Sequence, residues 1–505
     1  MRHSPIDLSS DEFRSLGHSL VDRVADLFAT LPTRRVAPGE SPADVRRVLP
    51  SGGLPNQGMN PHVLMAEAAE LLFEHSTFNG HPRFFGYITA PAAPLGVLGD
   101  LLAAAVNPNV GSFSLSPAAT EIERQAIRWI CELVGFPASG AGLFVSGGNM
   151  ANIVCFLAAR AAKAPWDLRA EGLTAGSSRP LVFYGSAEMH TWVQKAADIT
   201  GLGTAATRWI PTDARQRMRV DALRAQIERD VADGSLPFFL VGTAGTTSTG
   251  AIDPLDELAA LCREYDLWFH VDGAYGAPAA VVPELAEELR AIADADSIAV
   301  DPHKWLYAPL EAGCAIVRDA RTLDAAFHYR PPYYHFEGAE EDPPTNFYEW
   351  GPQNSRGFRA LKVWLTLRQV GREGYRRMIE DDIAFTRALF DAADAHPELR
   401  AVTRGLSIAT FAYVPEDLRA RDDAGDDAVR KYVDGLNAEI LARTQEEGRL
   451  YLSNAVIDGR FLLRACIVNF RTQLDDACAV PDLIADAGRR IDSTMRAAAA
   501  EPAPG

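Results

Sequence analysis

The sequence predicts an α/β protein with a mostly parallel sheet of seven strands, helices on both faces of that sheet, and a small α+β domain at the C-terminus. Seven short apolar runs alternate with stretches of helical periodicity, which is the pattern of strands joined by crossover helices. Two of these runs are followed by polar residues that a buried strand does not need, Asp272 and Lys304. Ligands bind outside the carboxyl ends of the strands in such sheets, so the same pattern predicts the location of a site.

The seven strands are expected between residues 142 and 317, and most of them are separated by helical stretches. The apolar runs are 142–146, 180–184, 207–210, 238–242, 267–271, 297–301 and 313–317. An amphipathic helix over 121–134 precedes the first run, with its apolar residues on one face.

Lys304 lies in the segment Asp301-Pro-His303-Lys304-Trp305, directly after a strand-like run. A lysine normally keeps its ammonium group in water. Close to His303, or removed from water, Lys304 is expected to have a lowered pKa, which makes a neutral amine available for Schiff-base chemistry. A buried Asp272 needs a cationic partner to stay ionised. A protonated pyridine nitrogen is such a partner, and an Asp and a Schiff-base lysine together are how pyridoxal phosphate (PLP) is held.

From about Pro82 to about Arg372, the chain resembles the group II PLP-dependent decarboxylases, which include aromatic amino-acid and glutamate decarboxylases. The resemblance implies the PLP-dependent transferase fold type I, the aspartate-aminotransferase type. It implies that Lys304 carries the cofactor, that Asp272 keeps the ring nitrogen protonated, and that His190 stacks on the ring near the substrate carboxylate. Three more residues are assigned to cofactor binding on the same basis: Thr247, Asp301 and His303.

A phosphate site is expected where the run 142–146 meets Gly147-Gly148-Asn149-Met150 and an apolar helix. The unsatisfied N–H groups and the dipole of a helix N-terminus favour an anion, and glycines allow close approach. A glycine pair alone is also common in plain turns. The position matches the PLP-phosphate loop of the resembled family, which assigns Gly148 and Asn149 to the phosphate. No nucleotide-binding glycine motif is present.

Three further segments are assigned to the substrate and the proton transfer by the resemblance. The aromatic stretch 81–89 is expected to line the substrate pocket through Tyr87 and Ile88. The segment 107–116, with Asn109, is expected to cross a dimer interface into the neighbouring pocket. The proline-rich, acidic stretch 327–344 breaks every periodicity and is typical of a loop that closes over an active site. Tyr333 in this stretch matches the loop tyrosine of the family.

Composition agrees with a soluble enzyme. The chain has 505 residues, of which 47% are hydrophobic and 23% are charged, so it can bury a large core. The net charge of −18 argues against nucleic acid or an anionic membrane as a partner. The six cysteines have no metal-ligand spacing, no metal is expected, and a cytoplasmic location fits best. Neither a secretory leader nor a membrane-spanning run is expected.

The chain is expected to divide into an N-terminal helical arm (1–100), a large PLP-binding domain (101–375) and a small α+β domain (376–505). The arm begins with a helix over 12–31, for which Ser10-Asp11 is the expected cap. The C-terminal domain is expected to contain a helix to 395, a strand at 409–414, an acidic loop at 416–427, a helix at 429–445, a hairpin at 449–470 and a last helix to about 495. The resembled family forms homodimers with shared active sites.

The predicted function is PLP-dependent decarboxylation of an L-amino acid to its amine and CO₂, with an aromatic substrate. Tyr87 and the neighbouring Phe84-Phe85 offer stacking surface, and Arg83 is the one candidate clamp for an acidic side chain. Four alternatives remain open: an aldehyde synthase acting on an aromatic amino acid, a glutamate- or diaminobutyrate-type decarboxylase, an aminotransferase, and a non-catalytic PLP-fold protein.

Overall fold

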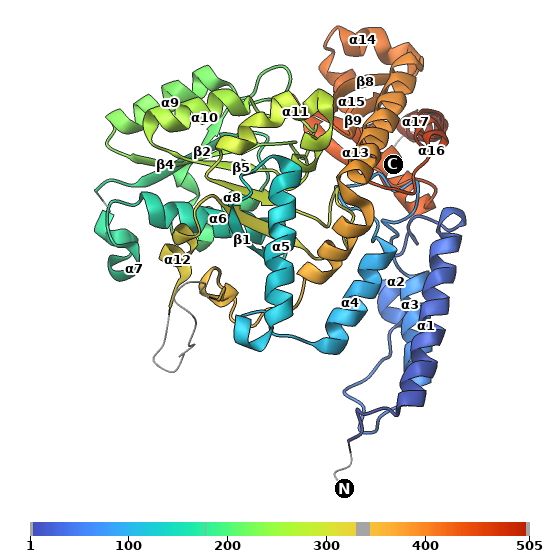
Figure 1. Ribbon diagram of the computed structural model, residues 1–505. Coiled ribbons are helices and arrows are strands. Elements are labelled where there is room, and N and C mark those ends of the chain that lie inside the picture. Colours follow the sequence, from blue (N-terminus) through green and yellow to red (C-terminus); the bar gives the residue numbers. More distant parts are fainter. Residues whose placement is uncertain (1–3, 177, 330–343, 501–505) are drawn as a thin grey trace.

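The computed structural model describes residues 4–176, 178–329 and 344–500 (Figure 1). Its largest element is the predicted seven-stranded sheet, with the strand order β1-β7-β6-β5-β4-β2-β3. The strands are β1 (Ala141–Val145), β2 (Leu181–Ser186), β3 (Thr207–Ile210), β4 (Leu236–Thr243), β5 (Trp268–Asp272), β6 (Ser297–Val300) and β7 (Gly313–Val317). All seven coincide with predicted runs to within a few residues.

The sheet is mostly parallel, as predicted, because only β7 runs against its neighbours β1 and β6. The central strands β2, β5 and β6 are buried along their whole length, which explains why they appear as continuous apolar runs instead of alternating ones. Two antiparallel steps restore the original direction, so β1 runs the same way as β6. The carboxyl ends of β1, β2, β4, β5 and β6 therefore meet at one edge of the sheet.

Helices cover both faces of the sheet (Figure 1). The helix α6 lies under β6 and β7 with α8 and α12 beside it, and α9 and α10 pack on the opposite face. The helices of this part of the chain are α5 (Pro117–Val134), α6 (Gly148–Lys163), α7 (Leu168–Glu171), α8 (Trp192–Ile199), α9 (Val220–Ala232), α10 (Leu255–Tyr265), α11 (Pro283–Leu289) and α12 (Arg321–Phe327).

The C-terminal domain is α+β, as predicted, and contains a four-stranded antiparallel sheet of order β10-β11-β9-β8. Its strands are β8 (Leu399–Gly405), β9 (Ile408–Tyr413), β10 (Ser453–Ile457) and β11 (Arg460–Cys466), and its helices are α14 (Arg419–Asp423), α15 (Asp427–Glu447), α16 (Leu474–Cys478) and α17 (Val480–Ala500). Two details of the prediction were wrong. Strand β8 was missed because its residues alternate in burial with charged side chains, and the expected acidic loop contains the short helix α14.

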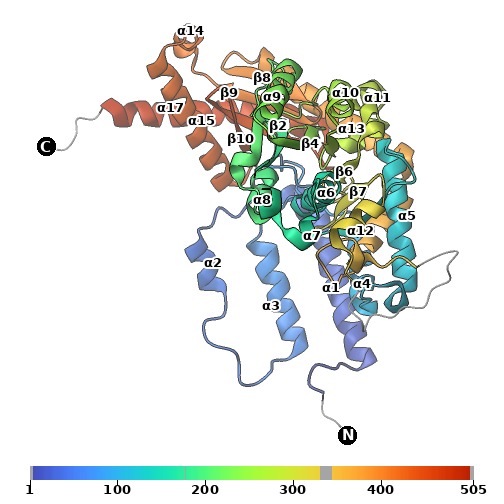
Figure 2. The same ribbon diagram turned by 90° about the vertical axis from the view of Figure 1, so that its left-hand side faces the viewer.

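The N-terminal segment contains four helices: α1 (Ser10–Thr30), α2 (Pro42–Val48), α3 (Pro61–Glu74) and α4 (Pro94–Val106). The predicted cap was wrong by one residue. Ser9 caps α1, because its side chain accepts from the backbone N–H of Glu12 while Glu12 bonds back to Ser9. Figure 2 shows α2 and α3 standing away from the rest of the molecule. Ala69 is the one buried residue of α3, so this arm has little core of its own.

A long helix, α13 (Ala360–Ala395), connects the large domain to the C-terminal one. Gly371, with φ of 66°, interrupts its helical geometry. The first part of α13 packs on α4 and α5, and the later part packs on β8 and α16. The boundary expected between residues 375 and 376 therefore falls inside α13, four residues after the kink at Gly371.

Candidate active site

A cavity of about 340 Å³ opens at the carboxyl edge of the large sheet. It collects residues from the turns after β1, β2, β4, β5 and β6, which the strand directions bring together. Its lining consists of Ile88, Ser146, Gly147, Gly148, Asn149, Asn152, His190, Thr243, Gly245, Thr247, Asp272, Ala274, Tyr275, Asp301, His303 and Lys304. Nine of the residues predicted from the sequence thus lie around one cavity.

Lys304 is held in this cavity by an ion pair with Asp301. The distance from Lys304 Nζ to Asp301 Oδ2 is 2.9 Å, and Asp301 is almost completely buried. Burial alone lowers the pKa of Lys304, but the adjacent Asp301 carboxylate outweighs it and the net pKa is raised. The expectation of a lowered pKa was therefore wrong for the protein without cofactor. Burial also lowers the pKa of His303, so His303 is not the cation that was invoked.

The glycine turn after β1 lies against this ion pair. A side chain at Gly148 would collide with the Asp301 carboxylate, which explains why glycine is needed there. Gly147, with φ of 84°, is the N-cap of α6 and provides no side-chain cap. The N-terminus of a 16-residue helix therefore presents backbone N–H groups at Gly148 and Asn149, next to the cavity.

Asp272 ends β5 at the same edge of the sheet, and each of its two carboxylate oxygens accepts a hydrogen bond. Oδ2 accepts a hydrogen bond of 2.8 Å from the indole Nε1 of Trp192, and Oδ1 accepts a longer one of 3.2 Å from the backbone N–H of Ala274. Asp272 is buried but reaches the cavity. A buried carboxylate with one weakly bonded oxygen is suited to a cationic ligand atom.

His190 lies across the cavity from the β1 turn, at the start of the segment that leads into α8. Its Nδ1 accepts the backbone N–H of Trp192 at 3.3 Å. Loss of surrounding water lowers the pKa of His190, the Asp272 carboxylate opposes this with a smaller effect, and the nearby Lys304 ammonium adds to the lowering. The imidazole is therefore neutral near pH 7.

Two of the remaining predicted residues, Tyr87 and Asn109, lie outside the cavity. Tyr87 is exposed and does not line the cavity of its own chain. Asn109 also lies outside it, and its side chain accepts the backbone N–H groups of Gly111 and Arg356. Tyr333 falls outside the described residues. The roles given to these three residues stay predictions.

The structure adds residues that sequence reasoning missed. Asn152, one turn into α6, joins the carbonyl of Gly148 to the buried ring of His270. Tyr275 lines the cavity and stacks on Trp305 at 5.0 Å between ring centroids. Arg464 of β11 is buried, donates to the carbonyl of Thr247 at 2.8 Å, and has an Nη2 without a hydrogen-bond partner. A signal was available for Tyr275, which directly follows the Asp272 motif, but not for Arg464, which comes from another domain.

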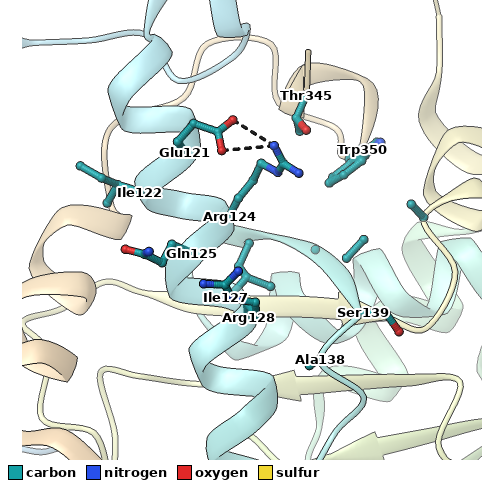
Figure 3. A pocket seen from close by; sticks show the side chains of 14 residues that line it. Glu121, Ile122, Arg124, Gln125, Ile127, Arg128, Ala138, Ser139, Thr345 and Trp350 are labelled. Carbon is teal, nitrogen blue, oxygen red and sulfur yellow. Dashed lines mark hydrogen bonds and ion pairs between the residues drawn. The ribbon is translucent and has the colours of Figure 1, made fainter. Parts of the chain in front are cut away.

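An arginine outside the cavity and a second cavity beside α5 are the other features of interest. Arg83 forms an ion pair of 3.0 Å with Asp476, away from the cavity, so its guanidinium is already paired. A larger cavity, of about 620 Å³, lies beside α5. Figure 3 shows Arg124 of this cavity paired with Glu121 and reaching toward Thr345 and Trp350. Among the described residues its lining contains no lysine, so it offers no amine for Schiff-base chemistry.

The sheet topology and the cavity together define an enzyme of the aspartate-aminotransferase-like fold, with a lysine and a buried aspartate at the carboxyl edge. Residues 42–411 match the family model described as the pyridoxal-dependent decarboxylase conserved domain. The chain belongs to this family of PLP-dependent decarboxylases, which are carboxy-lyases.

Curated relatives match over nearly the whole chain. An aromatic-L-amino-acid decarboxylase of Bacillus atrophaeus is 32% identical over 93% of this chain and 94% of its own length. A phenylacetaldehyde synthase of Petunia hybrida is 30% identical over 91% of both chains. Among solved structures, Catharanthus roseus tryptophan decarboxylase in complex with L-tryptophan has a TM-score of 0.85 and 28% identity, and the match covers 97% of this chain and 100% of that one.

The residues of the cavity fit pyridoxal phosphate. The α6 N-terminus with its glycine turn suits a phosphate, because free N–H groups and the helix dipole face an anion. Lys304 supplies the amine, and the weakly bonded oxygen of Asp272 suits a protonated ring nitrogen. In the part of the chain that the structure describes, no group of three or more side chains could hold a metal ion. No helix among the described residues is long and apolar enough to cross a membrane.

Asp382 connects α13 to the segment that carries Lys304. Its Oδ2 accepts both the indole N–H of Trp305, at 2.8 Å, and the hydroxyl of Tyr307, at 2.6 Å. Tyr307 has a φ of 57°, an uncommon conformation for a residue with a side chain. Burial raises the pKa of Asp382 to about 7, and the two donors only partly oppose this. The carboxyl group therefore binds a proton more tightly in the folded than in the unfolded protein.

Replacing Lys304 by alanine tests the cofactor attachment. We expect Lys304→Ala to bind PLP weakly, to lack the visible absorbance of lysine-bound PLP, and to lose turnover by several orders of magnitude. Absorbance spectra of the purified, PLP-loaded proteins provide the measurement. Lys195→Ala, on the exposed side of α8, is the matched control and should keep the wild-type spectrum. An unchanged spectrum in Lys304→Ala would move the attachment to another lysine.

The raised pKa of Asp382 predicts a pH-dependent stability. Its contribution is complete below the unfolded pKa, near 4, and is lost as pH rises through the folded value of about 7. Asp382→Asn removes this dependence, so it should gain stability relative to wild type as pH rises from 5 to 7, by up to about 1.4 kcal/mol for each pH unit. Urea unfolding of the PLP-free proteins measures this. The exposed neighbour Asp381→Asn should show no such trend, and a pH-independent difference for Asp382→Asn contradicts the assignment.

Proposed function

We propose that this decarboxylase acts on an aromatic L-amino acid and releases the corresponding amine and CO₂. The observation that carries the proposal is the convergence of Lys304, Asp272 and His190 on one cavity beside the α6 N-terminus. PLP bound there supplies an electron sink for the bond that breaks at Cα. Decarboxylases of aromatic amino acids are also among the relatives that align over nearly the whole chain.

Each of the three residues has a role that follows from its chemistry. Lys304 holds the cofactor and afterwards releases the product amine. Its ion pair with Asp301 must be broken or shared when the amine reacts, because a protonated amine is not a nucleophile. Asp272 keeps the ring nitrogen protonated through its weakly bonded oxygen. The phosphate is bound by the N–H groups at Gly148 and Asn149, and Thr247, Asp301 and His303 complete the cofactor site.

His190 is proposed to stack on the cofactor ring and to orient the substrate carboxylate. With Nδ1 occupied by the N–H of Trp192, the neutral ring carries its proton on Nε2. An N–H donor at Nε2 can hold a carboxylate, and the bond that breaks is the one kept perpendicular to the ring of the cofactor.

The preference for an aromatic side chain is supported by what lines the cavity. Ile88 and Tyr275 contribute apolar and aromatic surface, and Lys304 is its one lysine or arginine among the described residues. Arg83, the candidate clamp for glutamate, is paired with Asp476. Arg464 does not line the cavity but donates to the carbonyl of Thr247, which does.

A homodimer is proposed as the functional unit. The helix α4 exposes Leu98, Leu101, Leu102 and Val106, and α3 exposes Val63, Leu64, Met65 and Leu72. Such apolar faces on a protein with net charge −18 indicate a protein partner, and the two arms of a symmetric pair can cover each other. Asn109 and Tyr87 would then contribute to a cavity shared between subunits. Sedimentation in solution tests this proposal, and a monomer contradicts it.

A cytoplasmic location is proposed from the thiols. All six cysteines are free, and five of them are buried. Burial raises the pKa of the Cys131 and Cys155 thiols to about 12, which makes them unreactive. Unpaired thiols are typical of a reducing compartment.

An aldehyde synthase is the second candidate, because a phenylacetaldehyde synthase is among the relatives. Both reactions begin with loss of CO₂, which leaves an electron pair at Cα. A proton at this carbon gives the amine. Reaction with dioxygen and water instead gives aldehyde, ammonia and hydrogen peroxide. The proton donor therefore decides the product, and Tyr333 is the proposed donor.

A substrate panel tests the preferred function. We expect turnover of one or more of tyrosine, tryptophan, phenylalanine and DOPA to exceed that of every other amino acid in a panel of the twenty standard amino acids and DOPA. CO₂ and aldehyde are both followed for each substrate. Much faster turnover of glutamate or diaminobutyrate would reject the aromatic preference. Among the described residues, the cavity lining has no arginine, and no lysine besides Lys304, to pair with an acidic side chain.

Replacing Tyr333 by phenylalanine tests the proton donor. The ring is kept but the proton is lost, so Tyr333→Phe should still release CO₂ while its product shifts from amine toward aldehyde and peroxide. A positioned general acid contributes roughly 10²–10⁴-fold, which is enough to change the product. Tyr334→Phe is the matched control, since a one-residue error would move the role there. If both variants make amine at the wild-type rate without peroxide, neither phenol is the donor.

A further inference from the structure

Trp192, which does not line the cavity, is bonded to two residues that do. Its backbone N–H donates to His190 Nδ1 at 3.3 Å, and its indole Nε1–H donates to Asp272 Oδ2 at 2.8 Å. Trp192 is the first residue of α8 and is completely buried. Its indole therefore has a fixed position between the strand that ends at Asp272 and the turn that carries His190.

Packing holds the indole in one orientation. The Trp192 ring meets the ring of His270 edge-on at 6.0 Å and the ring of Phe156 at 6.4 Å. Both neighbours are buried, and His270 is itself held by Ser297 and Asn152. A ring confined on these sides cannot turn its N–H away from Asp272 without opening the core.

The two oxygens of Asp272 are consequently not equivalent. Oδ2 is engaged by a short bond to a buried indole, and a hydrogen bond to a charged acceptor is about twice as strong as one between neutral groups. Oδ1 has only the 3.2 Å bond from Ala274. The carboxylate plane is set by the first bond, and the second oxygen is the one available to a ligand.

We propose that Trp192 is a positioning residue that fixes the carboxylate of Asp272, so that Oδ1 meets the protonated ring nitrogen of PLP. The inference rests on the proposed role of Asp272 and adds the residue that makes this role possible. Trp192 itself does not touch the cofactor. Without its N–H, the carboxylate can rotate, and the pairing with the ring nitrogen loses its preset geometry.

A purely structural role is the competing explanation, because any large buried ring fills space. Trp268 provides the matched control. It lies on the same strand as Asp272, is also buried, and donates its indole N–H to the hydroxyl of Ser297 at 2.8 Å. Trp268→Phe therefore removes the same chemical group from a buried hydroxyl, which keeps its bond to His270, and it does not touch Asp272.

The experiment is a double-mutant cycle on PLP binding, measured by equilibrium dialysis and by the visible absorbance of the bound cofactor. Trp192→Phe should weaken PLP binding roughly tenfold or more, the loss expected from one hydrogen bond to a charged group. In the Asp272→Asn background the same change should have no further effect beyond about twofold, because the carboxylate it positions is gone. Trp268→Phe should weaken binding by less than about twofold in both backgrounds.

Two results overturn the proposal: wild-type affinity in Trp192→Phe, or an equal loss in both backgrounds. Thermal unfolding of each PLP-free variant shows whether it folds. If Trp192→Phe does not fold, benzothienyl-alanine at position 192 replaces it, because this residue keeps both rings and lacks only the N–H. The readout is binding, so a wild-type enzyme that decarboxylates no amino acid would reject the proposed function and leave this inference open to the same test.

Discussion

The ion pair between Lys304 and Asp301 is the interaction on which the rest of the site depends. A half-buried ammonium and a buried carboxylate are each costly to remove from water, and their mutual attraction offsets part of that cost. Their position then limits what can surround them. Gly148 must lack a side chain, since any Cβ would meet the carboxylate, and this requirement places the bare N-terminus of α6 beside Lys304. The charged pair thus lies directly against the first residue of α6.

The topology explains why these groups can meet at all. Turns after β1 and β6 are separated by more than 150 residues of sequence, yet both lie at one edge because β7 between them runs antiparallel. The parallel neighbours β5, β4 and β2 add Asp272, Thr247 and His190 to the same edge. The strand directions therefore bring these side chains together, and each side chain can be assigned to the strand that it follows.

This dependence on strand direction is also why the sequence predicted so much. Asp272 and Lys304 follow apolar runs, and such runs reveal buried strands in the sequence alone, without knowledge of tertiary contacts. Trp192, Asp382 and Arg464 were missed because each acts through a partner distant in sequence, and a buried tryptophan or arginine looks like any other in a single chain. The errors at the cap of α1 and at β8 are local, because neighbouring serines cap equally well and a half-exposed strand lacks an apolar run. The prediction of a lowered pKa for Lys304 failed for a different reason. The sequence shows His303 next to Lys304, but only the fold shows that the Asp301 carboxylate pairs with the lysine amine.

The site is, finally, supported from both domains. Asp382 and Tyr375 of α13 bond to Trp305, Tyr307 and the carbonyl of Leu306, directly after Lys304. From the small domain, Ser407 bonds to the hydroxyl of Tyr275, and Arg464 bonds to the carbonyl of Thr247. None of these supporting residues lines the cavity, yet each contacts a residue that lines it or follows Lys304. The small domain therefore supports one wall of the cavity through Tyr275 and Thr247, and α13 supports the segment directly after Lys304.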